Sequence, residues 1–107
     1  MINYTPHTVT VRDDNGNDHV YPASGIVPRV SMVTTPDIPL EDGTPTIRVK
    51  YGEALLPDGH AGPCIVSTMF ADAYKGDSEL FVPDSEPSAI RENGQIIAVR
   101  ALIRRSR

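Results

Sequence analysis

The chain of 107 residues has a net charge of -4, one cysteine, ten prolines, eight glycines and few aromatic side chains. This length predicts a single domain over residues 1–107, and the acidic balance argues against DNA or RNA as a partner. The lone Cys64 excludes an internal disulfide and a cysteine-based metal cluster, and no apolar run predicts a membrane span or a signal peptide. A cytoplasmic location is therefore expected.

Two strands and a tight turn are predicted near the N-terminus. Residues 8–12 (TVTVR) alternate between apolar and polar side chains, as a half-buried strand does. Asn15-Gly16 follows, and this pair favours a type I′ hairpin turn, because that turn needs a positive φ at both of its central residues. The chain is then expected to return as a strand over residues 19–21.

The next segment predicts two strands with a proline-rich connection. Residues 22–25 (PASG) indicate a turn into a strand over residues 26–34, where Pro28 favours an edge or a bulge. Residues 35–46 contain three prolines and a glycine and are predicted to form an exposed loop. Residues 47–51 alternate again, which predicts a strand with one face in water.

One helix is predicted over residues 68–75, after a short buried strand at residues 64–66. Ser67 suits the N-cap position, and Gly76 marks the end of the helix. The strand that follows is predicted to stop at Pro83. The side chains expected on the apolar face of the helix are Met69, Phe70 and Ala73.

A second type I′ hairpin is predicted at Asn93-Gly94 within residues 89–104. The opposite face of its long second arm is too apolar for water alone, so the helix or another subunit is expected to cover it. These elements predict an α+β fold, mostly β, built as an antiparallel sheet or a small barrel-like sandwich with one short helix. The buried face of the second arm is expected to carry Ile97, Val99, Ala101 and Ile103.

Catalytic and metal-binding motifs are missing from the sequence. Residues 13–18 (DDNGND) lack the glycine and glutamate positions of an EF-hand loop, so a turn is favoured. Cys64 lies in an apolar strand, where a free cysteine behaves as a small hydrophobe. We therefore expect no metal, no cofactor and no enzymatic activity. The histidines lie far apart in the sequence, at His7, His19 and His60.

Two local features favour an anion. Ser67 and Thr68 open the predicted helix, where free N–H groups attract phosphate or carboxylate, although Ser67 could serve only as a cap. The PASG turn precedes Arg29, which can hold phosphate through two hydrogen bonds, although a surface turn with a solvated arginine is the alternative. The C-terminal end is basic and could meet phosphate or be solvated; it carries Arg100, Arg104, Arg105 and Arg107.

Five segments, taken in order, resemble a set of small proteins encoded by tailed phages and prophages. They are NYTPHTVTV, YPASGIVPRVSM, CIVSTMFADA, LFVPDS and ENGQIIAVRAL, and together they span most of the chain. The chain departs from that pattern at Pro28, where a small residue is usual, and at Ala98, where glycine is common. Residues 35–46 also resemble an insertion.

The resemblance implies a phage accessory protein acting in the host cytoplasm. By analogy with such proteins, the leading hypothesis is a counter-defence sponge, a homo-oligomer that sequesters a cyclic nucleotide or cyclic ADP-ribose immune signal. The alternative is a protein-interaction module that uses an apolar sheet face and the loop at residues 35–46. An enzyme with His7 as acid-base is the weakest hypothesis, and a structural role for His7 at the start of the first strand is favoured over ligand contact. The candidate ligand-binding residues are His7, Tyr21, Ser24, Arg29, Ser67 and Arg100.

Overall fold

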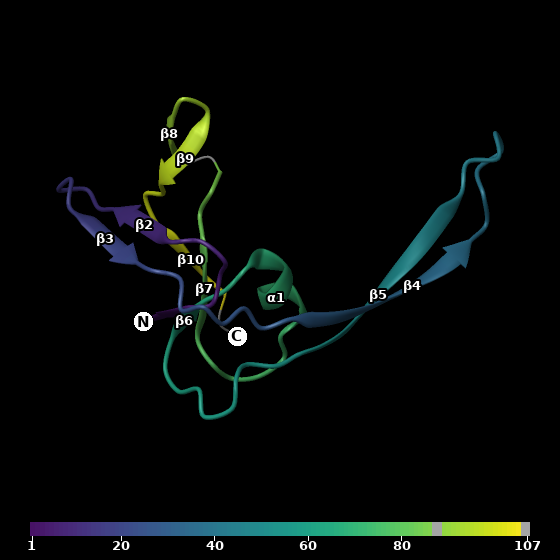
Figure 1. Cartoon of the computed structure of the whole chain (residues 1–107), viewed down its shortest axis with the longest axis horizontal. Coiled ribbons are helices and arrows are strands. Elements are labelled where there is room, and N and C mark those ends of the chain that lie inside the picture. Colours follow the sequence, from purple (N-terminus) through teal and green to yellow (C-terminus); the bar gives the residue numbers. More distant parts are fainter. Residues whose placement is uncertain (87–88, 106–107) are drawn as a thin grey trace.

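A mixed four-stranded sheet forms the centre of the molecule, with the strand order β1-β6-β7-β10. The computed structural model describes residues 1–86 and 89–105. Strands β1 (Ile2–Asn3), β6 (Cys64–Ile65) and β7 (Leu80–Pro83) are parallel, and β10 (Leu102–Arg104) is antiparallel to β7. The helix α1 (Thr68–Ala73) follows β6 and lies beside this sheet (Figure 1).

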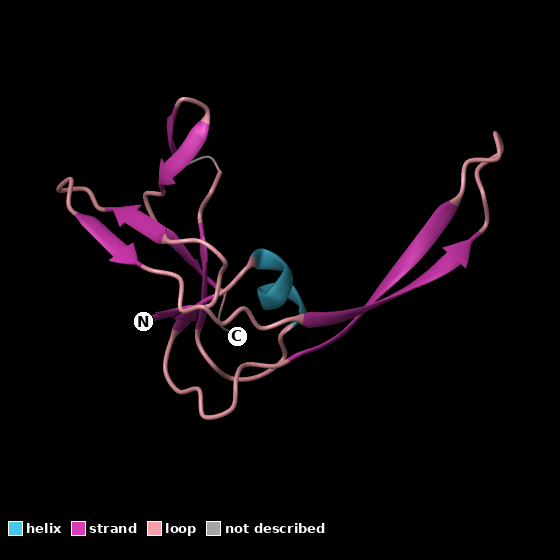
Figure 2. Cartoon of the chain, viewed as in Figure 1, coloured by secondary structure: helices cyan, strands magenta, loops and turns pink. Residues whose placement is uncertain are grey.

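Three antiparallel hairpins extend from this centre (Figure 2). They are β2 (Val9–Arg12) with β3 (Asp18–Tyr21), β4 (Val30–Asp37) with β5 (Thr46–Ala54), and β8 (Ile90–Glu92) with β9 (Gln95–Ala98). The predicted α+β, mostly β class is confirmed, and the strands in the described part of the chain form sheets and hairpins and no closed barrel. The parallel pairing at the centre was not predicted.

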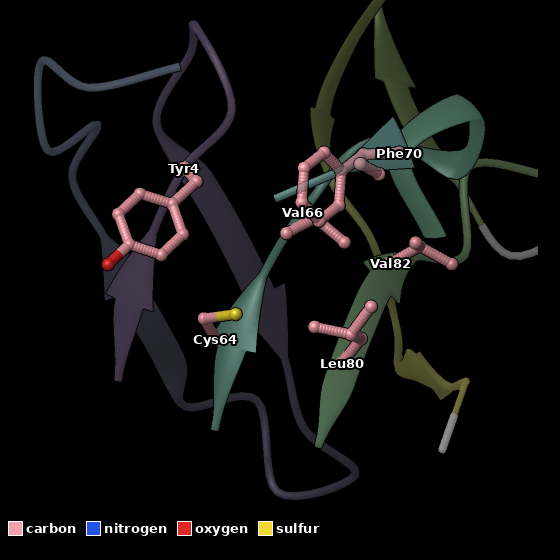
Figure 3. Packing of buried hydrophobic residues seen from close by; sticks show 7 residues of the cluster. Tyr4, Cys64, Val66, Phe70, Leu80 and Val82 are labelled. Carbon is pink, nitrogen blue, oxygen red and sulfur yellow. The ribbon is translucent and has the colours of Figure 1, made fainter. Parts of the chain in front are cut away.

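The core lies where β6 and β7 meet α1 and the start of the chain (Figure 3). The predicted buried strand at residues 64–66 is confirmed, because its side chains are buried in succession as expected for a central parallel strand. Phe70 is the largest fully buried side chain and anchors α1 on the sheet. The cluster comprises Tyr4, Ala54, Cys64, Val66, Phe70, Leu80 and Val82.

Asn3 joins the N-terminal segments to the central sheet. Its side chain is 1% exposed, and its amide nitrogen donates to the carbonyls of His7 and Tyr21, each at 2.8 Å. Its amide oxygen accepts from the backbone N–H of Thr5 at 2.9 Å and lies 2.7 Å from the Thr5 hydroxyl. Its backbone carbonyl accepts from the Ser24 N–H at 2.9 Å. The full hydrogen-bonding capacity of a buried amide is therefore satisfied.

The two predicted asparagine-glycine turns differ. Asn93 and Gly94 both have a positive φ, so the type I′ turn is confirmed there. Asn15 does not, and only Gly16 adopts the left-handed region, so the first turn is a type I turn with a bulge. The reason is Asp13, whose carboxylate accepts from the N–H groups of Asn15 and Asn17 and fixes this alternative backbone path.

The loop predicted at residues 35–46 is shorter than expected, because the two strands of a hairpin extend into its ends. Strand β4 continues to Asp37 and β5 begins at Thr46, so only residues 38–45 form a loop. Pro36 is tolerated because β4 is an edge strand that need not donate at this position. The Arg48 side chain donates to the Asp37 carboxylate at 2.7 Å and ties the two strands together. Residues 26–29, predicted as strand, precede β4.

The β4–β5 hairpin, here called the arm, projects away from the rest of the molecule (Figure 1). The molecule measures 54 × 39 × 25 Å and has a radius of gyration of 17.0 Å. A compact domain of this length has a radius of gyration of about 13 Å. The arm accounts for the elongated shape, because one end of the hairpin is attached to the body beside α1 and the other extends into solvent.

The helix is shorter than predicted. Ser67 is the N-cap, as expected, and its hydroxyl accepts from the Phe70 N–H at 3.2 Å. The helix ends at Ala73 because Tyr74 takes an extended conformation, so Gly76 does not end it. Of the predicted apolar face, Phe70 is buried but Met69 is exposed.

The long strand predicted after Asn93-Gly94 is divided into two strands that belong to different sheets. Strand β9 ends at Ala98, and Val99 bonds instead to β2, through Thr10 at 2.9 Å and Arg12 at 2.8 Å. This pairing bends the chain before β10 begins. The expected buried face is therefore wrong for three of its four members. Val99 is buried, whereas Ile97, Ala101 and Ile103 are exposed.

Replacement of Asn3 by alanine tests the role of this residue. Asn3→Ala leaves the Tyr21 carbonyl and the Thr5 N–H without their Asn3 partner, and each such group costs about 1–3 kcal/mol when it is shielded from water. We expect the free energy of unfolding to fall by roughly 3 kcal/mol, measured by urea denaturation. Asn15→Ala, at an exposed turn, is the control and should change it by less than about 0.5 kcal/mol. Equal losses in the two variants would contradict this role.

Candidate functional site

A hollow of about 410 Å³ lies at the carboxyl ends of the parallel strands. The segments that follow β1, β6 and β7 each contribute to its wall, and β2 and β9 close it. In sheets with parallel strands, ligands commonly bind outside this end. The hollow brings together two of the predicted ligand-binding residues, His7 and Ser67. We call it the His7–Ser67 hollow.

His7 is held through its backbone carbonyl, and its ring makes no hydrogen bond to the other described residues. Its carbonyl accepts from Asn3 at 2.8 Å and lies 3.0 Å from the Thr5 hydroxyl, which fixes the bend at residues 5–7. The residue itself is exposed at the rim of the hollow. The predicted structural role and the predicted ligand contact are therefore compatible, because different atoms of His7 serve them.

The wall of the hollow combines hydroxyl groups with an apolar side. Thr8, Thr10, Ser67, Thr68 and Ser85 supply hydroxyls, and residues 96–99 supply the apolar side. No Arg or Lys is present among the described residues that line it. The hollow therefore suits a sugar or a flat base better than a phosphate, which needs a cation or several N–H donors.

Tyr21 and Ser24 lie outside the hollow and hold the backbone together. Tyr21 ends β3 opposite Val9, and its carbonyl accepts from Asn3 at 2.8 Å. The Ser24 hydroxyl accepts from the Ile26 N–H at 3.2 Å, which is a local serine turn. The PASG segment thus forms the turn that was predicted.

Arg29 and Arg100 also lie outside the hollow. Arg29 is exposed just before the arm begins, and Arg100 is exposed in the bend between β9 and β10. The C-terminal arginines are partly neutralised, since Arg104 pairs with Glu79 and Arg105 with Asp72. The Arg104 guanidinium also lies 4.8 Å from the centre of the Phe81 ring. Arg107 lies outside the described residues.

The arm has one apolar and one polar face, and the apolar face is uncovered. Directly paired residues share a face, so the register sorts Met32 with Tyr51, Thr34 with Val49, and Pro36 with Ile47. The other face carries Val33, Lys50, Thr35, Arg48, Asp37 and Thr46. Met32 is 55% exposed and Ile47 is 62% exposed. We call Met32, Thr34, Pro36, Ile47, Val49 and Tyr51 the apolar arm face.

A groove of about 660 Å³ lies between the base of the arm and α1. The arm contributes Val49 and Tyr51 to it, and the helix contributes the exposed Met69 together with Lys75 just beyond its end. The apolar arm face therefore continues into this groove. We call it the Met69 groove; its remaining lining residues are Lys50, Gly52, Thr68, Asp72 and Ala73.

The other two histidines have structural partners. His60 Nε2 lies 2.9 Å from the Gly62 carbonyl, which can only accept, so this nitrogen carries the proton. His60 Nδ1 then accepts from the Tyr4 hydroxyl at 2.8 Å. His19 contacts the Asp13 carboxylate at 2.9 Å in the first hairpin. This hydrogen bond, followed by that from the Asn17 N–H, lowers the pKa of Asp13.

Cys64 is buried, and the acidic residues of the described part of the chain are dispersed. The Cys64 side chain is fully buried, and burial raises the pKa of its thiol to about 11. Within residues 1–86 and 89–105, His, Cys, Asp and Glu do not cluster in threes as a metal ion requires. The helix in the described part of the chain, α1, does not have the length and apolar character to span a membrane.

Comparisons with known proteins give no relative. Scans against protein-family models, curated protein sequences and solved structures found no match to this chain. The sequence did not predict that the apolar arm face is exposed. The alternation at residues 47–51 identifies an apolar side of the strand, but it does not show whether another part of the molecule covers that side.

Burial should make Cys64 inert in the folded protein. At pH 8 a thiol with a pKa near 11 is ionised in about one molecule in a thousand, and the reagent has no access to it. We expect no labelling by a disulfide reagent within minutes under native conditions. Complete labelling should follow in guanidinium chloride. Rapid labelling of the native chain would contradict the burial of Cys64.

Proposed function

We propose that the protein is a protein-interaction module that binds its partner through the apolar arm face. The observation that carries this proposal is the amphipathic hairpin itself. Its paired apolar residues lie on one face, and the body of the molecule does not cover them. Large apolar patches left exposed on one face of a protein mark sites of interaction.

The energetics of a two-stranded sheet support this proposal. An isolated hairpin is marginally stable in water, and it normally needs a further strand or another layer on its apolar face. In the arm, backbone pairing and the Asp37–Arg48 ion pair join the strands, but this exposed pair contributes little. Burial of the apolar arm face would stabilise the hairpin by about 25 cal/mol of free energy for each Å² of apolar surface removed from water. A partner that covers this face would thus stabilise the β4–β5 hairpin.

Chemistry elsewhere in the chain also favours binding over catalysis. His60 and His19 are engaged with neighbouring side chains, and Cys64 is buried. His7 is exposed, and its hydrogen bonds to other described residues are made by its backbone carbonyl. A general base is normally oriented by a third group, and no described residue holds the His7 ring in this way.

Two valines on opposite faces of the arm give a matched test. Val49 lies on the apolar arm face and Val33 lies on the polar face, and both are exposed. We expect tagged wild-type chain and tagged Val33→Asp to retain the same partner during purification from cells that also make untagged chain, whether that partner is the untagged copy or another protein. Val49→Asp should lose that partner, because its charge would be desolvated in the interface. Retention of the partner by Val49→Asp would contradict the proposal.

A second candidate function is supported by the His7–Ser67 hollow. The resemblance to phage proteins suggests a counter-defence sponge for a nucleotide-derived signal, and two of the six candidate residues line this one hollow. Its hydroxyls and apolar side suit the nucleoside part of such a ligand. Arg29 and Arg100 do not line it, so phosphate contacts would have to come from other groups or another copy.

Native mass spectrometry with cyclic nucleotides and cyclic ADP-ribose isomers tests this second candidate. We expect one unmodified nucleotide to bind wild-type chain, with affinity reduced at least about tenfold, or roughly 1.4 kcal/mol, in His7→Ala. His19→Ala, in the exposed first hairpin, is the control and should bind as wild type does. A bare protein with every nucleotide would contradict the sponge, and a converted nucleotide would indicate an enzyme.

A further inference from the structure

We propose that the partner of the arm is a second copy of this chain. In this arrangement two arms pack antiparallel, apolar arm face against apolar arm face, and the tip of each arm lies at the Met69 groove of the other copy. The inference rests on the proposed function and adds the identity of the partner. Surface area, the pattern along the arm, and charge each support it.

The exposed area of the chain is what a dimer would need. The accessible surface is 7653 Å², whereas a compact monomer of 11.6 kDa exposes about 5,800 Å². The excess of about 1,800 Å² is more than the roughly 800 Å² that each partner contributes to a standard interface. Packing of the apolar arm face on an identical arm would remove part of this excess from water.

The apolar arm face is self-complementary about its centre. The Thr34–Val49 pair lies in the middle, with Met32–Tyr51 toward the body and Pro36–Ile47 toward the tip. A two-fold axis through the middle pair therefore places the inner apolar pair of one copy on the outer apolar pair of the other. An interface between identical copies with two-fold symmetry requires such a pattern.

The tip and the groove have opposite charge. The tip loop carries Glu41 and Asp42 beside the exposed apolar Ile38 and Leu40, and Ile38 is 82% exposed. Hydrogen bonds from the Thr44 hydroxyl and then from its N–H lower the pKa of Asp42, so this carboxylate stays charged at neutral pH.

The Met69 groove supplies the complementary cations. It contains Lys50 and Lys75, and neither has an ion-pair partner among the described residues. Asp72, the acidic residue of the groove, is already paired with Arg105. The groove is thus open to an acidic tip. Parallel arms would instead bring two acidic tips together, which like-charge repulsion disfavours.

Light scattering and cross-linking on the full chain test this inference together. We expect wild type and Val33→Asp to have at least twice the 11.6 kDa mass of the chain, and Val49→Asp to have that mass alone. Circular dichroism of Val49→Asp should show that its body remains folded. For the orientation, Leu40→Cys chain and Lys75→Cys chain should form a disulfide between copies when mixed, and neither should do so alone. The native Cys64 is buried and does not interfere.

Each other outcome contradicts a defined part of the account. Cross-linking of Leu40→Cys with itself would show parallel arms and overturn the arrangement. A monomeric wild-type chain whose arm still retains another protein would overturn self-association and leave the proposed function standing. An oligomer that survives Val49→Asp would overturn self-association through the arm, because its interface would lie away from the apolar arm face.

Discussion

The buried side chain of Asn3 is the contact on which the body of this protein depends. One amide joins the bend at residues 5–7, the end of β3 and, through the backbone, the turn at Ser24. These bonds hold the N-terminal segments on the central sheet, where β1 pairs with β6. The carboxyl ends of the parallel strands thereby meet, and His7 comes to lie in the same hollow as Ser67.

The arm differs from the body in where its apolar side chains lie. The body buries its apolar side chains around Phe70, whereas the arm sorts its own onto one face and leaves that face in water. A sheet of two strands has no interior, so such sorting is useful only if something packs on it. The apolar arm face and the Met69 groove share Val49 and Tyr51 and so form one continuous surface, which supports the proposal that a second arm is the partner.

Local patterns in the sequence predicted much of this fold. Alternation at residues 8–12 and 47–51 identified strands, Ser67 identified the start of the helix, and Asn93-Gly94 identified a type I′ turn. Prolines at residues 36, 39 and 45 favoured a loop over residues 35–46 and hid the end of β4 at Asp37, because proline is common in loops and is also tolerated on an edge strand.

Contacts between distant segments could not be predicted in this way. Strand β1 has two residues and pairs with β6 some sixty residues later, and no local pattern indicates that pairing. This pairing brings His7 and Ser67 into the same hollow. The sequence could therefore identify each of them as a candidate ligand-binding residue, but it could not predict that they lie together. The bend at Val99 likewise depends on β2, so periodicity alone gave the wrong buried face. Whether an apolar strand face is covered is also a property of the whole molecule.

Methionine oxidation of the unmodified chain tests the central claim most directly. The three methionines of the sequence are Met1, Met32 on the apolar arm face, and Met69 in the groove, and all are about half exposed in the single chain. If the arm of a second copy covers the face and the groove, Met32 and Met69 should be oxidised by peroxide several-fold more slowly than Met1. Similar rates at all three would show that the arm is uncovered and would contradict the account.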